Sequence, residues 1–166
     1  AEMILDGNYC EIGLESTILK CGEGKIDILR EGSVTRENIQ KVISFDFPKI
    51  EISLRSPGKE IISPGQLSAH YSPKSNLRLN VLEPNKEEVY LAFGPKEGSI
   101  EGFSLSENKI LTEAARNLYN YLRLADEIIL KDLNSNKKSI AVAPIPNYGI
   151  GASINDRLLR ASTLKI

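Results

Sequence analysis

A stretch without clear helix or strand patterns divides the chain into two unequal parts. Residues 47–76 contain four prolines and six serines, with two proline–glycine pairs that are typical of turns, so no long helix or strand is expected there. A structureless stretch of about 30 residues is unusual inside a compact domain and indicates a linker or a functional loop. The sequence His-Tyr-Ser-Pro at 70–73 favours the functional loop.

The segment before this stretch is expected to be too small to fold alone. Runs of β-prone residues at 3–5, 16–20 and 25–30 predict short strands, with the last two joined as a hairpin. Thr35 is the expected N-cap of a helix that Phe47 and the following proline end. Two hairpin strands need a larger sheet to cover them. Because the chain also opens on strand-like sequence and begins with alanine, we expect a fragment.

The segment after the stretch alternates predicted strands with amphipathic helices. Helices are expected at about 110–125, where apolar residues share one stripe, and at about 152–162. The predicted strands are 77–82, 89–93, 100–105, 127–130 and 140–145. This order predicts an α/β domain with a mostly parallel sheet and helices packed on it.

Composition excludes several classes of protein. Lysine and arginine number 21 against 22 aspartates and glutamates, so the chain as a whole is not expected to bind nucleic acid or membranes by charge, although a local basic patch stays open. The longest apolar runs, such as 140–145, are far shorter than the ~20 residues of a membrane helix, and no leader is visible, which favours a cytoplasmic protein. One histidine and two cysteines cannot form a common structural zinc site.

A glycine pair near the C-terminus is a candidate anion site. Gly149 and Gly151 follow a predicted strand and precede the last helix, where backbone N–H groups can bind an anion. The fuller dinucleotide pattern is absent, so a tight strand-to-helix turn explains the glycines as well. The polar residues at 155–157 are expected to form hydrogen bonds between elements rather than to catalyse a reaction.

A cysteine nucleophile is a further alternative. Cys10 or Cys21 with His70 as base fits nucleophilic catalysis by residue type. Both cysteines lie in or beside strand-like sequence, where a small buried apolar residue is the commoner role. Three tyrosines are expected to be half-buried packing residues: Tyr119, Tyr121 and Tyr148.

The predicted hairpin brings Ser16 and Arg30 to the same end of two antiparallel strands. A serine hydroxyl both donates and accepts hydrogen bonds, and an arginine guanidinium is a charged fork suited to phosphate or carboxylate. A serine in the strand ladder and an arginine in a surface ion pair are the structural alternative. The residue pair alone leaves both interpretations open.

Four motifs in order resemble the threonylcarbamoyl-AMP synthases, in the long two-domain form of the YrdC family. They are Gly-Leu-Glu-Ser-Thr-Ile at 13–18, Ile-Leu-Arg-Glu-Gly at 28–32 followed by Val-Thr at 34–35, Ser-Pro-Gly at 63–65 with 70–73, and Gly-Ile-Gly-Ala at 149–152 with 155–158 and 160–161. The resemblance spans essentially the whole chain. It implies that 1–46 is the C-terminal edge of a YrdC-type α/β catalytic domain, 47–76 an interdomain linker or lid, and 77–166 a C-terminal Rossmann-like α/β domain.

The resemblance also implies a reaction. The family makes threonylcarbamoyl adenylate and pyrophosphate from L-threonine, bicarbonate and ATP, a nucleotidyl transfer that uses Mg²⁺. The product serves the modification of tRNA to threonylcarbamoyladenosine, so the downstream threonylcarbamoyl-transferring machinery and tRNA are the implied partners. No membrane partner is implied.

Residue by residue, the resemblance implies that Ser16 binds L-threonine and that Arg30 binds ATP. Tyr71 is expected to reach back from the linker to the nucleotide, and His70 beside it is a weaker candidate. No catalytic or metal-binding residue is assigned to the chain. Because the N-terminal region that lines the ATP and threonine pockets is not in the sequence, we expect the chain alone to be inactive. A non-catalytic module that docks a partner or senses a ligand is the alternative.

Overall fold

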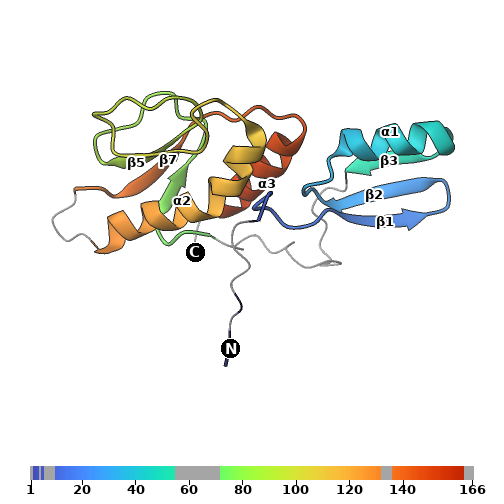
Figure 1. Cartoon of the computed structure of the whole chain (residues 1–166), viewed down its shortest axis with the longest axis horizontal. Coiled ribbons are helices and arrows are strands. Elements are labelled where there is room, and N and C mark those ends of the chain that lie inside the picture. The colour runs from blue at the N-terminus through green and yellow to red at the C-terminus, as the bar shows by residue number, and fades with distance from the viewer. Residues whose placement is uncertain (1, 4, 6–9, 55–71, 132–135, 163–166) are drawn as a thin grey trace.

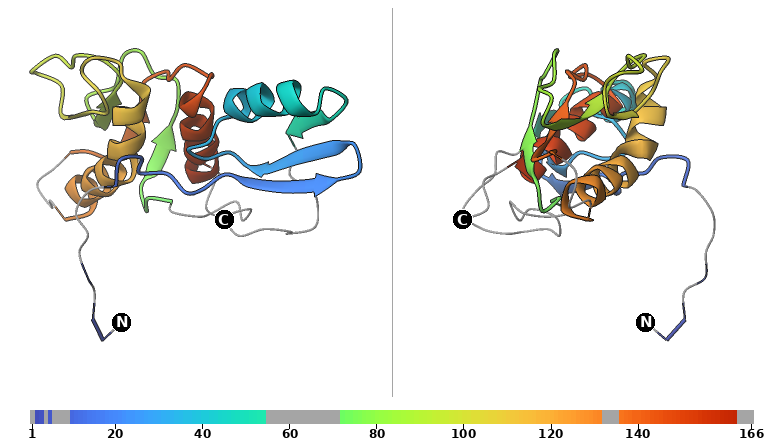
Figure 2. Two further views of the ribbon diagram at one scale, coloured as in Figure 1. Left: turned by 45° about the vertical axis from the view of Figure 1, so that its right-hand side comes forward. Right: turned by 90° about the vertical axis from the view of Figure 1, so that its left-hand side faces the viewer.

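The described residues form two α/β units that lie side by side, with the last helix beside the hairpin (Figure 1). The computed structural model describes residues 2–3, 5, 10–54, 72–131 and 136–162. We call the elements between 18 and 54 the hairpin unit, and those between 72 and 162 the parallel-sheet unit. The segment 10–17 runs along the parallel-sheet unit before it enters the hairpin (Figure 2).

The hairpin unit is a three-stranded sheet packed against one helix. Strands β1 (Ile18–Gly22) and β2 (Lys25–Arg30) pair antiparallel, as predicted, and β3 (Glu51–Leu54) pairs parallel with β2. Helix α1 (Arg36–Asp46) begins at the predicted N-cap, where the Thr35 hydroxyl and the Asn38 side chain form a reciprocal capping box. The core of the unit consists of four buried isoleucines: Ile26, Ile28, Ile39 and Ile52.

Two features of this region differ from a structureless stretch and from the predicted strands. The stretch 47–76, in which no long helix or strand was expected, contains the four-residue strand β3, because Ile52 is buried in register beside Ile26. The expected strand at 3–5 is not seen at its described positions. Met3 and Leu5 are 77% and 88% exposed and lie in no strand, so neither residue has the burial that supports a strand.

The parallel-sheet unit confirms the predicted α/β class. Its strands occur in the spatial order β4-β7-β5-β6, and all three neighbouring pairs are parallel. The elements are β4 (Asn76–Arg78), β5 (Glu88–Ala92), β6 (Gly102–Ser104), α2 (Leu111–Lys131), β7 (Ser139–Val142) and α3 (Ile150–Ser162). Side chains along β5 point alternately to the two faces of the sheet. Val89 and Leu91 belong to the core shared with α2 and α3, whereas Tyr90 and Ala92 pack on the other side of the sheet.

The predicted strand 127–130 is instead the end of helix α2. The buried stripe of Leu118, Leu122 and Ala125 continues into Ile128 and Ile129, which pack partly buried against the same core. The apolar spacing along one helix face therefore outweighs the local β propensity of the isoleucines. Other strands are shorter than expected, since β4 ends at Arg78 and β6 covers only Gly102–Ser104. Within the described ranges, no helix has the length and apolar character needed to cross a membrane.

A glycine in β6 sets the spacing between the last two strands of the sheet. Gly102 has φ +140°, and a Cβ atom built there overlaps the carbonyl oxygen of Tyr90 in β5. Gly102→Ala should therefore lower the free energy of unfolding by about 2 kcal/mol or more. Gly98→Ala is the control, because a Cβ at that position meets no atom within 4 Å. Urea denaturation of both variants measures the difference, and equal stability of the two would contradict the packing described.

Candidate functional site

The structure brings Ser16 and Arg30 together. Arg30 ends strand β2, and Ser16 lies just before β1, where the pairing register shifts between Ile18 and Leu19. The Arg30 Nε atom donates to the Ser16 carbonyl oxygen at 3.0 Å, and one terminal nitrogen donates to the Ser16 hydroxyl at 3.2 Å. Ser16 is exposed and Arg30 half-buried. A permanently charged group and a hydroxyl thus lie at one exposed end of the hairpin.

The chain after β2 packs closely on the chain before β1. Gly32 is buried, and a Cβ atom there overlaps the carbonyl oxygen of Glu15. The Thr17 hydroxyl donates to the Val34 carbonyl oxygen at 2.6 Å. Only glycine permits this approach at position 32. The backbone on both sides of Ser16 is therefore held against residues 32–34.

Helix α3 contacts both of these segments through one buried arginine. The Arg157 side chain is 6% exposed, and its Nε atom donates to the Glu15 carboxylate at 2.7 Å. Its terminal nitrogens donate to the Glu31 carbonyl oxygen at 2.8 Å and to the Asp156 carboxylate at 2.5 Å. The Tyr119 hydroxyl of α2 lies 3.2 Å from both Glu15 carboxylate oxygens. We call Glu15, Tyr119, Asp156 and Arg157 the Glu15–Arg157 cluster.

Burial and charge shift the pKa values within this cluster. Burial raises the pKa of the Glu15 carboxyl, but hydrogen bonds from Arg157 and the Glu15 backbone, with the charge of Arg157, outweigh it and lower the pKa below the usual 4.5. Burial and the charge of Glu15 raise the pKa of Tyr119 to about 12. At neutral pH, Glu15 and Arg157 are therefore ionised. Tyr119 stays protonated, and its hydroxyl donates a hydrogen bond to the Glu15 carboxylate.

The turn before α3 does not support the anion site suggested by its glycines. The Gly149 N–H lies 3.4 Å from a carboxylate oxygen of Glu37 in the hairpin unit, so this chain supplies the negative charge itself. Gly149 has φ +53°, and a Cβ on Gly151 overlaps the Pro146 carbonyl oxygen. These observations favour the tight-turn interpretation. Asn155 donates to the Ile145 carbonyl oxygen at 3.0 Å, which fits the inter-element role expected for 155–157.

The cysteines differ from the expectation that they are buried. Cys10 and Cys21 are free and exposed. His70 and Tyr71 lie outside the described residues, so their expected roles remain predictions. Among the three tyrosines, only one departs from the expected half-buried state, because Tyr148 is 65% exposed. Across the described ranges, no group of three or more histidine, cysteine, aspartate or glutamate side chains can hold a metal ion.

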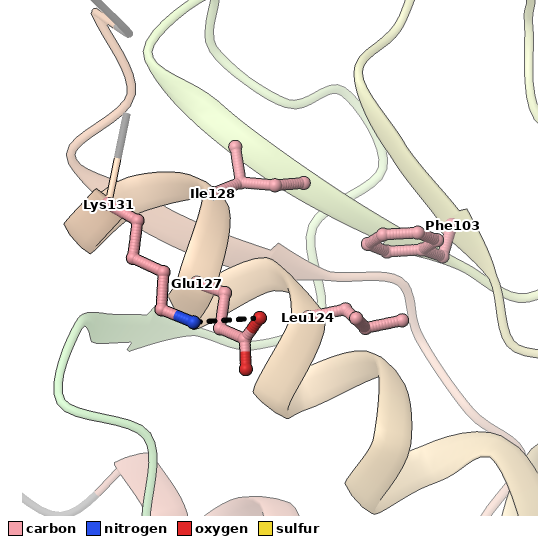
Figure 3. A pocket seen from close by; sticks show the side chains of 5 residues that line it. All are labelled: Phe103, Leu124, Glu127, Ile128 and Lys131. Carbon is pink, nitrogen blue, oxygen red and sulfur yellow. Dashed lines mark ion pairs between the residues drawn. The ribbon is translucent and has the colours of Figure 1, made fainter. Parts of the chain in front are cut away.

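Two hollows on the parallel-sheet unit include neither Ser16 nor Arg30 in their lining. An open groove of about 500 Å³ between β6 and α2 is lined by Phe103, Leu124 and Ile128, with the Glu127–Lys131 ion pair at its rim (Figure 3). A crevice of about 320 Å³ lies where β4 and β7 end. It is lined by Leu79, Asn80, Val142, Ala143, Ile145, Asn147, Asn155, Leu158 and Leu159. Neither hollow includes a residue that was predicted from the hairpin.

No site role was predicted for Glu15 or Tyr119. Arg157 was expected only to form hydrogen bonds between elements, and its bonds to Glu15 and to the Glu31 carbonyl oxygen agree with that expectation. Glu15 and Arg157 are separated by 142 positions, so no local pattern joins them. The sequence feature that could have indicated a role for Glu15 was its position directly before Ser16, within the motif at 13–18.

Residues 34–163 match a protein family described as the C-terminal domain of threonylcarbamoyl-AMP synthase. The chain is 29% identical over 177 residues to the threonylcarbamoyl-AMP synthase of Bacillus subtilis, covering 96% of this chain and 48% of that protein. It is 28% identical over 182 residues to the synthase of Pyrococcus abyssi, covering 99% and 50%. The chain thus spans about half the length of the curated relatives that it matches.

Two solved structures share the fold. The structure of P. abyssi Sua5 complexed with L-threonine matches with a TM-score of 0.69 at 24% identity, covering 95% of this chain and 48% of that one. A P. abyssi Sua5 variant with alanine in place of a neighbouring histidine and tyrosine matches with a TM-score of 0.67 at 23% identity, covering 92% and 46%.

The Glu15–Arg157 pair predicts how stability depends on pH. Glu15→Gln should lower the free energy of unfolding by about 1–3 kcal/mol at pH 7, because it removes the charge opposite a buried guanidinium. The pKa of Glu15 is lower in the folded state, so its contribution is present above the unfolded value. The gap between the two proteins should therefore close as the pH falls below about 4.5.

Glu31→Gln is the matched control with the opposite sign. Burial raises the pKa of Glu31, and the negative charges of Asp156 and Glu37 add to this, so its ionised form disfavours folding. This variant should be at least as stable as the unsubstituted protein at pH 7, with a difference that shrinks as Glu31 becomes protonated on acidification. Urea denaturation between pH 7 and 3 tests both variants. A loss of stability of equal size in each would contradict the electrostatics described.

Proposed function

Because the match covers residues 34–163, the chain belongs to the threonylcarbamoyl-AMP synthase C-terminal domain family, and we propose that it is the C-terminal portion of such an enzyme. The complete protein would convert L-threonine, bicarbonate and ATP into threonylcarbamoyl adenylate and pyrophosphate. Its product would serve tRNA modification in the cytoplasm, with the threonylcarbamoyl-transferring machinery and tRNA as partners. The named relatives are synthases that are about twice as long as this chain, which supports the proposal.

The observation that carries this proposal is the contact of Arg30 with Ser16. We assign the Ser16 hydroxyl to L-threonine and the Arg30 guanidinium to ATP. Both groups lie at one exposed end of the hairpin, where an amino acid and a nucleotide would have to meet. The bound L-threonine named for P. abyssi Sua5 supports an amino-acid ligand for this family.

The chemistry fits a permanently charged side chain at this place. The amine of L-threonine would combine with bicarbonate, with loss of water, to give an N-carboxylate. An oxygen of this carbamate would then attack the α-phosphorus of ATP, so that a new P–O bond forms and the P–O bond to pyrophosphate breaks. The Arg30 guanidinium would offset negative charge on the phosphates as the reaction proceeds. Mg²⁺ is implied by the family. The described residues offer it no cluster of ligands, so we assign no metal-binding role to them.

We also propose that the stretch 47–76 acts as a linker and lid between two domains. Tyr71 would contact the nucleotide, with His70 as a weaker candidate. The P. abyssi Sua5 variant replaces a neighbouring histidine and tyrosine, the same residue types that occur at 70–71 here. Closing such a loop over the reactants would exclude water from the adenylate.

Residues 1–46 would then complete a larger catalytic domain, with 77–166 as the second domain. Exposed apolar residues on α1 and after it support this division, because a longer protein would cover them. The most exposed are Val42, Phe45 and Phe47, at 60%, 88% and 56%. The chain alone would be inactive, since other regions of the enzyme would line most of the ATP and threonine pockets.

A ligand-sensing or partner-docking module is the second candidate function. The crevice where β4 and β7 end favours it, because ligands of open α/β sheets bind outside the carboxyl ends of the strands. Titrating the complete protein that contains this chain with ATP and with L-threonine separates the candidates. A docking module should ignore both small molecules.

Substitutions at the hairpin test the assigned roles in the complete protein. Arg30→Ala should raise the KM for ATP by about tenfold or more, and Ser16→Ala should raise the KM for L-threonine by a smaller factor, about threefold to tenfold. Arg36→Ala is the control, since Arg36 lies in the same unit and donates to the Ile52 carbonyl oxygen. Threonine-dependent release of pyrophosphate is the measurement. Unchanged kinetics in both hairpin variants would overturn the assignments.

A further inference from the structure

Arg157 contacts the residues that directly neighbour Ser16 and Arg30. Glu15 precedes Ser16, and Glu31 follows Arg30. One guanidinium donates to the Glu15 carboxylate at 2.7 Å and to the Glu31 carbonyl oxygen at 2.8 Å. Helix α3 therefore contacts the chain just before β1 and just after β2, at the end of the hairpin where the candidate site lies.

These contacts are largely buried, and a single guanidinium shares them between two segments. The Arg157 side chain is 6% exposed and that of Glu15 is 22% exposed, so water replaces neither partner easily. A second hydrogen bond runs beside them, from the Ser153 hydroxyl of α3 to the Gly32 carbonyl oxygen at 2.9 Å. The arginine fork fixes direction as well as distance. A shift of α3 would therefore move both segments together.

The position of Glu15 transmits this restraint to Ser16. Adjacent residues share a planar peptide bond, so holding the Glu15 side chain limits the orientation of the Ser16 backbone. The Ser16 carbonyl oxygen is also the acceptor for Arg30. The Ser16 hydroxyl is a second acceptor for the same guanidinium. Arg157, Glu15, Ser16 and Arg30 thus form one continuous chain of contacts.

We propose that Arg157 is a positioning residue for the L-threonine site. It acts through Glu15 and the Glu31 carbonyl oxygen, without contact with the substrate, and it makes the hairpin site depend on the C-terminal helix. This inference rests on the proposed function. It adds a specific task for the parallel-sheet unit, whose helix α3 carries Arg157.

An ion pair elsewhere in the same unit provides a matched control. Arg78 in β4 donates to both carboxylate oxygens of Glu88, at 2.8 and 2.6 Å, and the Glu88 side chain is 4% exposed. This pair joins an edge strand to the sheet and contacts no hairpin residue in the bonds described. Arg78→Gln therefore breaks an ion pair with a buried carboxylate outside the hairpin, although the Arg78 side chain itself is 50% exposed. A purely structural role for Arg157 predicts similar kinetics for the two variants.

The experiment uses the complete protein that contains this chain. The variants are Arg157→Gln, Glu15→Gln, the double variant and Arg78→Gln, and pyrophosphate release is measured with varied L-threonine at saturating ATP. Arg157→Gln and Glu15→Gln should each raise the KM for L-threonine by about tenfold. The double variant should be little worse than either single one, because both substitutions break the same contact. Arg78→Gln should keep the KM for L-threonine within about twofold.

The possible outcomes separate this inference from the proposed function. If the unsubstituted protein releases no pyrophosphate in response to L-threonine, the proposed function fails and this inference falls with it. If that activity is present but the KM for L-threonine is unchanged in Arg157→Gln, only the inference is overturned. Equal increases in Arg157→Gln and Arg78→Gln would also overturn it, since they would indicate a general loss of stability that affects the site and not positioning by Arg157. A thermal melt of each variant reports that loss independently.

Discussion

The placement of the hairpin beside helix α3 depends on the hydrogen bonds and ion pairs of the buried Arg157 guanidinium. A charge with 6% of its side chain exposed is stable only when carboxylates and carbonyl oxygens surround it, and here these come from two units of the fold. The Asp156 carboxylate, in the same helix, pairs with one terminal nitrogen of the guanidinium. The other nitrogens require Glu15 and the Glu31 carbonyl oxygen as acceptors, so the hairpin must lie where it does for the helix to bury its arginine.

The two units differ in how far they can support themselves. The core of the parallel-sheet unit contains fourteen buried residues from both helices and the sheet, whereas the hairpin unit has four buried isoleucines. Small cores supply little stability, so the hairpin unit depends on its surroundings. Ile12 and Leu14 lie against the larger core, and Glu15 continues this contact as an ion pair. The candidate site is thus built on the weaker unit and held by the stronger one.

The sequence predicted what local patterns encode. Strand β2 matches the expected 25–30, and the Thr35 cap and the stripe of α2 follow from propensity and spacing. Strand β3 was missed because its parallel partner lies across α1, and the isoleucines at 128–129 were assigned to a strand because β propensity ignores which face a residue occupies. Ser16 and Arg30 were found because a hairpin is local. Glu15 and Arg157 were not paired, since 142 positions separate them and only packing brings them together.

Hydrogen exchange in the complete protein tests the central claim, that helix α3 and the hairpin site are coupled. Coupling is reciprocal, so if Arg157 positions the threonine site, bound L-threonine must in turn stabilise the contacts of α3. Saturating L-threonine should therefore slow amide exchange at residues 14–17 and also at 153–158, while exchange in β6 stays unchanged. Slower exchange at 14–17 with no change at 153–158 would contradict the account, because L-threonine would then bind independently of Arg157.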